Sequence, residues 1–255
     1  MIRRYGFAEF QKLLANLSIV WVSHIHADHH SGLPSLLRMR SKVSATPLVV
    51  VGPRQLRRVL SMYSRIEYVP IHFIDCAQTT EAKSAEGGVP EILSERLEDL
   101  GIATLRSVPV HHSCYHAFGV VLEGKRGWKL TFSGDTRPCD DLVMAAANST
   151  IFIHEATFEN GMMEEALAKK HSLCGEAIEC GRRANAYRTI LTHFSQRYPK
   201  IPVLDDTFTA TTCVAFDLMT FNLSNLENLP KVTTEAAALY EDAEDEGRDP
   251  TAMAN

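Results

Sequence analysis

Four histidines and an aspartate fall within seven consecutive positions of the segment SHIHADHHSGL, residues 23–33. His24 and His26 are two residues apart, so at the end of a strand their side chains can point to the same side. Asp28 and His29 follow at once, where a turn can direct them towards a second point. Imidazole and carboxylate groups at this spacing suit two metal ions that lie about 3.5–4 Å apart.

Further candidate ligands stand at the ends of three later segments that we interpret as strands. In TLRSVPVHH, strand alternation places His112 on the same side as the valines before it, so His112 is the first choice and His111 the second. Asp135 ends TFSGD at a Gly-Asp turn and could bridge two metals, and His193 ends the strand of ILTHF. Because strand ends meet at one edge of a sheet, we expect these ligands to converge.

The expected chemistry is metal-assisted hydrolysis. Imidazole-rich sites with carboxylates favour zinc, although manganese or iron would tolerate the same ligands. Two adjacent ions acidify a water between them and stabilise the charge that develops during attack. The sequence therefore predicts a hydrolase with two Zn²⁺ ions in its active site.

Composition narrows the class of protein. The chain has 255 residues, 45% of them hydrophobic, which fits one large domain with a substantial core. No apolar run approaches the roughly 18–20 residues of a membrane span, so we expect no membrane partner. The six cysteines include no CxxC pair, which argues against a disulfide framework and suits a reducing compartment.

Charge is unevenly distributed along the chain. Residues 232–255 carry seven acids against Arg248, a net charge of −6 within a total of −5, so the rest of the chain has a net charge of +1. We therefore expect a catalytic domain over 1–230 and a disordered acidic tail over 231–255. Segment 33–66 holds seven basic side chains and no acid, which indicates either a solvated helix face or a surface that faces phosphate.

Secondary-structure signals alternate between helix and strand, which predicts a layered α/β protein with mixed sheets. A loop is expected over 82–90, where glycine and proline cluster. The expected strands lie at 17–24, 46–53, 104–112, 117–124, 127–135, 150–157 and 188–194. The expected helices lie near the N-terminus and at 32–42, 54–65, 91–100, 141–148 and 162–185.

The order HxHxDH, later histidine, Gly-Asp and strand-end histidine resembles the metallo-β-lactamase superfamily. Three stretches are similar to the tRNase Z family, and to the C-terminal half of its long form in particular. They are SGDTRPC (133–139), IHEAT (153–157) with KHSL (170–173), and LTHFSQRY (191–198). The resemblance implies an αββα sandwich and a zinc-dependent endoribonuclease that removes the 3′ trailer of precursor tRNA by two-metal phosphodiester hydrolysis.

The resemblance also implies a role for each matching metal ligand. One zinc would be held by His24, His26 and His112, and the other by Asp28, His29 and His193. Asp135 would bridge the two ions. His30 lies beyond the spacing and is expected to pack or cap, and His154 is left outside the catalytic set as a core histidine.

Catalytic and substrate-binding roles follow from the same resemblance. Asp28 would also orient the attacking water. His171 of KHSL would donate a proton to the leaving 3′ oxygen, a task that suits an imidazole with a pKa near neutrality, and Glu155 would hold it. Ser195 and Arg197 would lie near the scissile phosphate or the discriminator end of the tRNA.

In the family pattern a glycine-rich first hairpin and a loop that grips the tRNA end would precede residue 1, and both are missing. We therefore expect a sandwich that lacks its N-terminal strands, with the targeting region absent. The expected partners are precursor tRNA and either the N-terminal half of a long form or a second copy of the chain. The resemblance suggests the nucleus, the mitochondrion or both. Two alternatives remain: a hydrolase of a small thioester or lactone on the same fold, and an inactive RNA-binding fragment.

Overall fold

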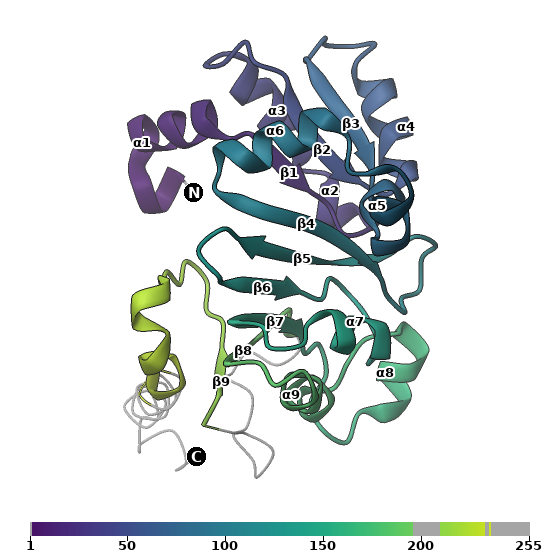
Figure 1. Ribbon diagram of the computed structural model, residues 1–255, viewed down its shortest axis with the longest axis vertical. Coiled ribbons are helices and arrows are strands. Elements are labelled where there is room, and N and C mark those ends of the chain that lie inside the picture. The colour runs from purple at the N-terminus through teal and green to yellow at the C-terminus, as the bar shows by residue number, and fades with distance from the viewer. Residues whose placement is uncertain (1, 196–209, 233–234, 236–255) are drawn as a thin grey trace, which may run out of the picture.

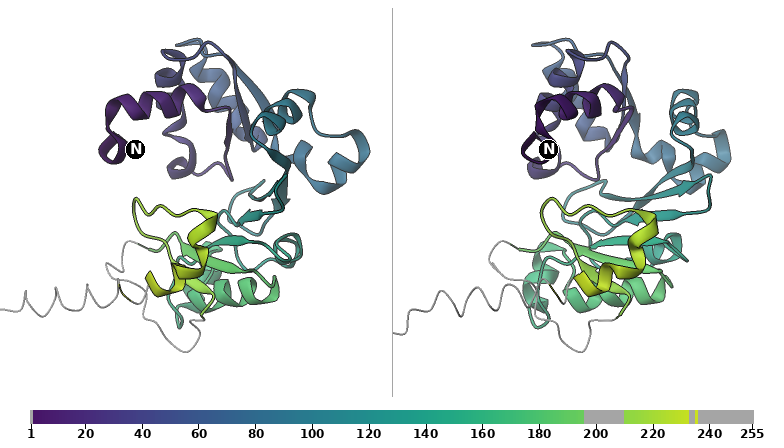
Figure 2. Two further views of the ribbon diagram at one scale, coloured as in Figure 1. Left: turned by 60° about the vertical axis from the view of Figure 1, so that its left-hand side comes forward. Right: turned by 90° about the vertical axis from the view of Figure 1, so that its left-hand side faces the viewer.

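The computed structural model describes residues 2–195, 210–232 and 235, and it contains two β-sheets (Figure 1) that share a buried apolar cluster. Three parallel strands in the order β1-β2-β3 form the first sheet: β1 (Ile19–Trp21), β2 (Leu48–Gly52) and β3 (Ile71–Asp75). In the described part of the chain β1 pairs with β2 alone. The second sheet has six strands, and helices cover the outer face of each sheet (Figure 2).

The six-stranded sheet is mixed. It runs in sequence order through β4 (Ile102–Pro109), β5 (Phe118–Gly124), β6 (Lys129–Phe132), β7 (Ile151–Glu155), β8 (Arg188–Thr192) and β9 (Thr212–Val214). The first three strands are antiparallel to one another, and β6 to β9 are parallel. The C-terminal ends of β4, β6, β7 and β8 therefore all lie at the same edge of this sheet.

The helices fall between these strands, as the alternating sequence signals predict. They are α1 (Ile2–Asn16), α2 (Ala27–His30), α3 (Leu33–Ser41), α4 (Arg54–Tyr63), α5 (Glu81–Gly87), α6 (Glu91–Asp99), α7 (Asp140–Ala145), α8 (Met163–Lys169) and α9 (Cys174–Arg183), with the short 3-10 helices η1 (Cys76–Thr79) and η2 (Leu223–Asn228). None of the helices among the described residues has the length and apolar character that crossing a membrane requires.

Three layers of apolar contact hold the sandwich together. Between the sheets, side chains of β2 such as Val49 and Val51 share a buried cluster with Phe118 and Val120 of β5. On the outer face of the first sheet, β2 packs against α3 and α4, and on the outer face of the second, β4, β5 and β7 pack against α7 and α9. Because β2 is covered on both faces, its LVVVG sequence shows no alternation and every residue is buried. The predicted αββα sandwich is confirmed.

Several predicted elements need correction. Residues 81–87 form helix α5, where a loop was expected over 82–90, because the glutamates, alanines and lysine of this segment favour a helix up to the glycine pair. Strands β3 and β9 were not predicted. The strands that precede the candidate ligands are shorter than expected, so several ligands lie in the loops just beyond them. The acidic tail lies outside the described residues apart from positions 231–232 and 235.

Candidate metal centre

The seven predicted ligands lie together at one edge of the sandwich. His24 follows β1, His112 follows β4 and Asp135 follows β6, each three residues after the strand ends, and His193 follows β8 directly. His26 precedes helix α2, which carries Asp28 and His29. Residues from both sheets thus meet where the strand ends converge, although the choice of His112 cannot rest on strand alternation, because β4 ends at Pro109.

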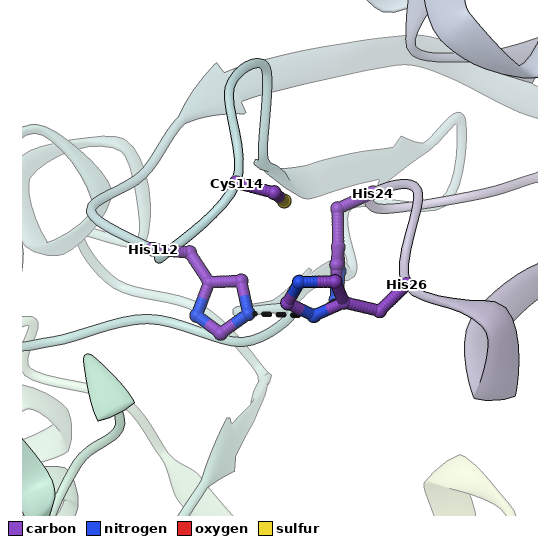
Figure 3. Close-up of side chains that lie close together, drawn as sticks. All are labelled: His24, His26, His112 and Cys114. Atoms are coloured by element: carbon purple, nitrogen blue, oxygen red, sulfur yellow. Dashed lines mark hydrogen bonds between the residues drawn. The ribbon is translucent and has the colours of Figure 1, made fainter. Parts of the chain in front are cut away.

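His24, His26 and His112 form one group, which we call the inner group (Figure 3). The Nδ1 atom of His26 lies 3.1 Å from the Nε2 atom of His24 and 3.1 Å from the Nε2 atom of His112. Three nitrogens bound tetrahedrally to zinc at its usual bond length would be about 3.3 Å apart. His24 and His112 are buried, so this group is close to the spacing that a metal requires and largely excluded from solvent.

Cys114 lies beside the inner group, with its Sγ within 4.8 Å of the ligand nitrogens of the three histidines (Figure 3). The sequence analysis did not single it out, although its spacing of two from His112 repeats that of His24 and His26. Burial raises the pKa of the Cys114 thiol, which favours its protonated form, a poor metal ligand. The three imidazoles are therefore the stronger ligand set.

Asp28, His29 and His193 form a second group, the outer group, with ligand atoms within 4.8 Å of one another. It is more open to solvent than the inner group: the exposed fraction of the side chain is 74% for Asp28 and 34% for His193, against 0% for both His24 and His112. His193 also adopts a left-handed backbone conformation with φ of 63°, which is unfavourable for a histidine and typical of functional sites.

Asp135 lies between the two groups. Its Oδ2 atom is 3.3 Å from the Nε2 atom of His29 and 3.6 Å from that of His193 in the outer group. The same oxygen is 3.6 Å from the Nε2 atom of His24 and 3.9 Å from that of His112 in the inner group. One carboxylate oxygen that faces imidazoles of both groups is well placed to bridge two ions.

The turn that presents Asp135 depends on Gly134. This residue has φ of +59°, and a Cβ atom there would lie 2.6 Å from the carbonyl oxygen of Phe118. Only glycine avoids both the strained backbone and the contact with β5.

Electrostatics favour the metal-binding protonation states of His24, His112 and Asp135. Burial lowers the pKa of His24 to about 3 and also lowers the pKa of His112, so both imidazoles are neutral at pH 7. Burial alone would raise the pKa of the Asp135 carboxyl, but the hydrogen bond from His29 and the charges of nearby imidazoles lower it. The same hydrogen bond raises the pKa of His29, so a metal that binds this imidazole has to displace its proton. Neutral imidazole and ionised carboxylate are the forms that bind metal.

Hydrogen bonds on the far side of the rings fix their orientation. The Nδ1 atom of His112 donates to the carbonyl oxygen of Lys170 at 3.0 Å, which leaves its Nε2 lone pair facing His26. The Nδ1 atom of His193 lies 2.8 Å from the Oγ1 of Thr157, and that of His24 lies 2.9 Å from the Oγ of Ser23. Such partners hold metal-binding imidazoles in one tautomer.

A second ionisable pair adjoins the ligands. Glu155 ends β7 and is buried, and its Oε1 lies 2.8 Å from the Nδ1 of His171. The backbone N–H of Thr136 and that of Ser172 also donate to this carboxylate, at 2.8 and 3.1 Å. Burial disfavours protonation of His171, yet the hydrogen bond and charge of Glu155 raise its pKa. The arrangement can keep His171 protonated beside the metal ligands.

Arg137 holds the segment that carries His171, a contact that sequence reasoning did not find. Its guanidinium donates to the carbonyl oxygen of His171 at 2.7 Å and to the Oε2 of Glu176 at 2.7 Å. Glu176 in turn accepts from the backbone N–H of Leu173 at 2.9 Å. The arginine in SGDTRPC was the available signal, but its partner is 39 residues away.

Five further residues named from the sequence lie outside the ligand set and the Glu155–His171 pair. His111 is exposed and belongs to neither ligand group, whereas His30 bonds the carbonyl oxygen of Ile25 at 3.1 Å, as its predicted packing or capping role requires. His154 is fully buried, with its Nδ1 bonded to the carbonyl oxygen of Glu155. Ser195 donates its N–H to the carbonyl oxygen of Thr157, and Arg197 lies outside the described residues.

Comparison with known proteins identifies the family. The Beta-lactamase superfamily domain matches residues 6–194, a range that contains all seven candidate ligands. The chain belongs to the β-lactamase superfamily. A crystal structure of a long-form RNase Z from yeast has a similar fold: it superimposes with a TM-score of 0.80 at 27% identity and covers 91% of the chain.

Two curated relatives narrow the resemblance within the superfamily. The Arabidopsis thaliana protein named tRNase Z TRZ3, mitochondrial, is 42% identical over 98% of the chain. The human protein named Zinc phosphodiesterase ELAC protein 2 is 38% identical over 94% of the chain. The chain spans about a third of these relatives, 34% of the plant protein, 30% of the human one and 36% of the yeast structure.

Proposed function

We propose that the chain is the catalytic part of a zinc-dependent endoribonuclease that cleaves the 3′ trailer from precursor tRNA. The observation that carries the proposal is the placement of Asp135 between two ligand groups, with the Glu155–His171 pair next to them. The names of the plant and human relatives, tRNase Z and zinc phosphodiesterase, support this substrate and chemistry.

The ligand set fits two divalent ions. The inner group would hold one zinc and the outer group the other, with Asp135 shared between them. Imidazole nitrogens that face one another at 3.1 Å are suited to a cation between them. Two ions bound there would supply an acidified water and would stabilise negative charge on a phosphate.

The chain's own residues would complete the reaction. Asp28, whose carboxylate is exposed at the outer group, would orient the attacking water. His171 would donate a proton to the 3′ oxygen as the bond to phosphorus breaks, which spares the leaving group from departing as an alkoxide. Glu155 would hold the imidazole through Nδ1, so that Nε2 carries the transferred proton. Ser195 and Arg197 would contact the scissile phosphate or the discriminator end.

Compartment and partners follow from the relatives. The mitochondrial designation of the plant relatives supports a mitochondrial location, and the family resemblance extends the proposal to the nucleus. Because the relatives are about three times as long, the remainder of a long form is the proposed protein partner, with a second copy of this chain as the alternative.

A cleavage assay tests the proposal. The chain is loaded with zinc and incubated with precursor tRNA labelled at its 5′ end, and we expect release of the 3′ trailer in a single cut. Mature tRNA that lacks a trailer serves as the control substrate and should stay intact. Hydrolysis of a small thioester or lactone without any cut in the precursor would overturn the proposal in favour of a small-molecule hydrolase.

A further inference from the structure

The basic segment 33–66 separates into two parts in the structure. Arg40 is buried and donates to the carbonyl oxygens of Leu17 and Thr46 at 2.8 and 2.6 Å, so it has a structural role. Arg38 lies 3.5 Å from the Oε2 of Glu67. Of the five other basic side chains of this segment, three lie on α4.

Helix α4 presents three exposed arginines on one face. They are Arg54, Arg57 and Arg58, spaced three and four residues apart, and Ser61 and Met62 continue the same face. These residues with Gln55 line a surface hollow of about 680 Å³, whereas the opposite face of the helix packs on the first sheet. We call Arg54, Arg57 and Arg58 the arginine face.

The arginine face has an unusual electrostatic setting. It lies in the first two turns of α4, where the helix dipole is already positive and where acidic side chains would be favourable. The first turn contains no acid, and the cap residue Pro53 offers no side-chain hydrogen bond. Within the described part of the chain Arg54 has one carboxylate neighbour, that of Asp75 at 3.8 Å, and neither Arg57 nor Arg58 forms an ion pair. Positive charge at this end of a helix, with a single carboxylate neighbour for three arginines among the described residues, suits an anionic ligand.

The position of the arginine face connects it to the metal centre. Because β1 and β2 are parallel, α4 begins at the edge of the sheet where His24 also lies. Gln55 donates from Nε2 to the carbonyl oxygen of Tyr115 at 3.2 Å, and Tyr115 is three residues after His112. The Tyr115 side chain is 87% exposed, although it is aromatic. Positive charge, an exposed ring and the candidate metal centre therefore belong to one continuous edge.

We propose that the arginine face and Tyr115 form a binding surface for the RNA substrate, on which the arginines contact backbone phosphates and Tyr115 stacks on a base. This inference rests on the proposed function for the identity of the RNA. Arginine beside an exposed aromatic ring is the combination that binds nucleic acid through phosphate contacts and base stacking.

The test compares two arginine variants of the full chain. Arg57→Gln/Arg58→Gln removes two charges from exposed positions, and Arg126→Gln removes one from the exposed β5–β6 turn, at the opposite edge from His112. Binding of precursor tRNA is measured by fluorescence anisotropy over a range of salt concentrations. We expect the double variant to bind about tenfold more weakly and its log–log salt slope to decrease by about 1.4–1.8, since each lost phosphate contact removes about 0.7–0.9. The control variant should bind like the wild type.

Two further measurements separate this inference from the proposed function. Hydrolysis of bis(p-nitrophenyl) phosphate, a small diester that cannot reach α4, should be unchanged in the double variant. Tyr115→Ala should weaken binding of precursor tRNA with an unchanged salt slope, because a stacking contact releases no counterion. Wild-type affinity and slope in the double variant, or no binding of precursor tRNA by the wild type, would overturn the inference. Failure of trailer cleavage with intact, arginine-dependent binding would instead count against the proposed function alone.

Discussion

The inner and outer ligand groups have similar residue types but different surroundings. Two imidazoles of the inner group are fully buried, and its nitrogens lie at nearly the spacing that a metal imposes. The outer group contains a mostly exposed carboxylate and a histidine in a strained backbone conformation. The comparison teaches that burial and preorganisation differ within one site, so we expect the inner position to bind its ion more tightly.

The largest effect is expected from removing the Asp135 carboxylate, which lies between the two groups. Asp135→Ala should release metal from both positions and lower turnover by about 10⁴-fold or more, because both ions lose a ligand and the imidazoles lose their balancing charge. Metal content per chain, measured by atomic spectroscopy beside the activity, checks this. Asp141→Ala, which removes an exposed carboxylate on α7, is the matched control. Two retained ions in Asp135→Ala would contradict the bridging role.

A smaller loss should follow from a residue that contacts both groups but belongs to neither. The His171 ring lies 4.9 Å from that of His112 and 5.4 Å from that of His193, measured between ring centres. His171→Ala should lower turnover by about 10²–10⁴-fold with both ions retained, since it removes the proposed general acid. His72→Ala, at an exposed histidine of β3, should leave turnover unchanged. Loss of metal in His171→Ala would make it a ligand or a structural support.

The comparison can be sharpened by removing one supporting hydroxyl from each group. Thr157→Val removes the hydroxyl that holds His193 and that also bonds the Glu155 carboxylate, and Ser23→Ala removes the hydroxyl that holds His24. Loss of such a partner lowers metal affinity by about 10–100-fold. We expect the outer position to be weakened by Thr157→Val near the upper end of that range, and the inner position by Ser23→Ala near the lower end, because packing also holds the buried His24 ring. Competition with a chromophoric chelator measures both affinities. If the inner position lost more metal affinity than the outer one, the expected order of the two groups would be wrong.

The smallest expected effect is the difference in metal affinity between the two positions of the wild-type chain. Titration with a chelator should remove the ions in two steps whose affinities differ by about tenfold, with the outer ion leaving first because its ligands are more exposed and less preorganised. His193→Ala should abolish the weaker step and preserve the tighter one. Simultaneous loss of both ions in the wild type would show that the groups act as one cooperative site.

The sequence predicted the layered architecture because apolar runs and helix signals alternate along the chain. It also predicted which segments carry ligands, because polar side chains of the right type follow strands that end at one edge. Strand β3 was missed because its IHFID sequence is short and half-exposed, so no clear period marks it. Thr157 and the Arg137–Glu176 pair depend on contacts between loops and helices distant in sequence, and no local pattern encodes such contacts. Cys114 was missed although its spacing of two from His112 was a local signal.

The candidate ligands come from both sheets: His24 and His26 follow the first sheet, whereas His112, Asp135 and His193 follow strands of the second. Any ion held by both sets would therefore act as a cross-link across the sandwich. Folding stability would then rise with the concentration of free metal, by about 2.7 kcal/mol at a hundred times the dissociation constant. Chelation should accordingly lower the melting temperature, so availability of metal would control how long the folded chain persists as well as its activity.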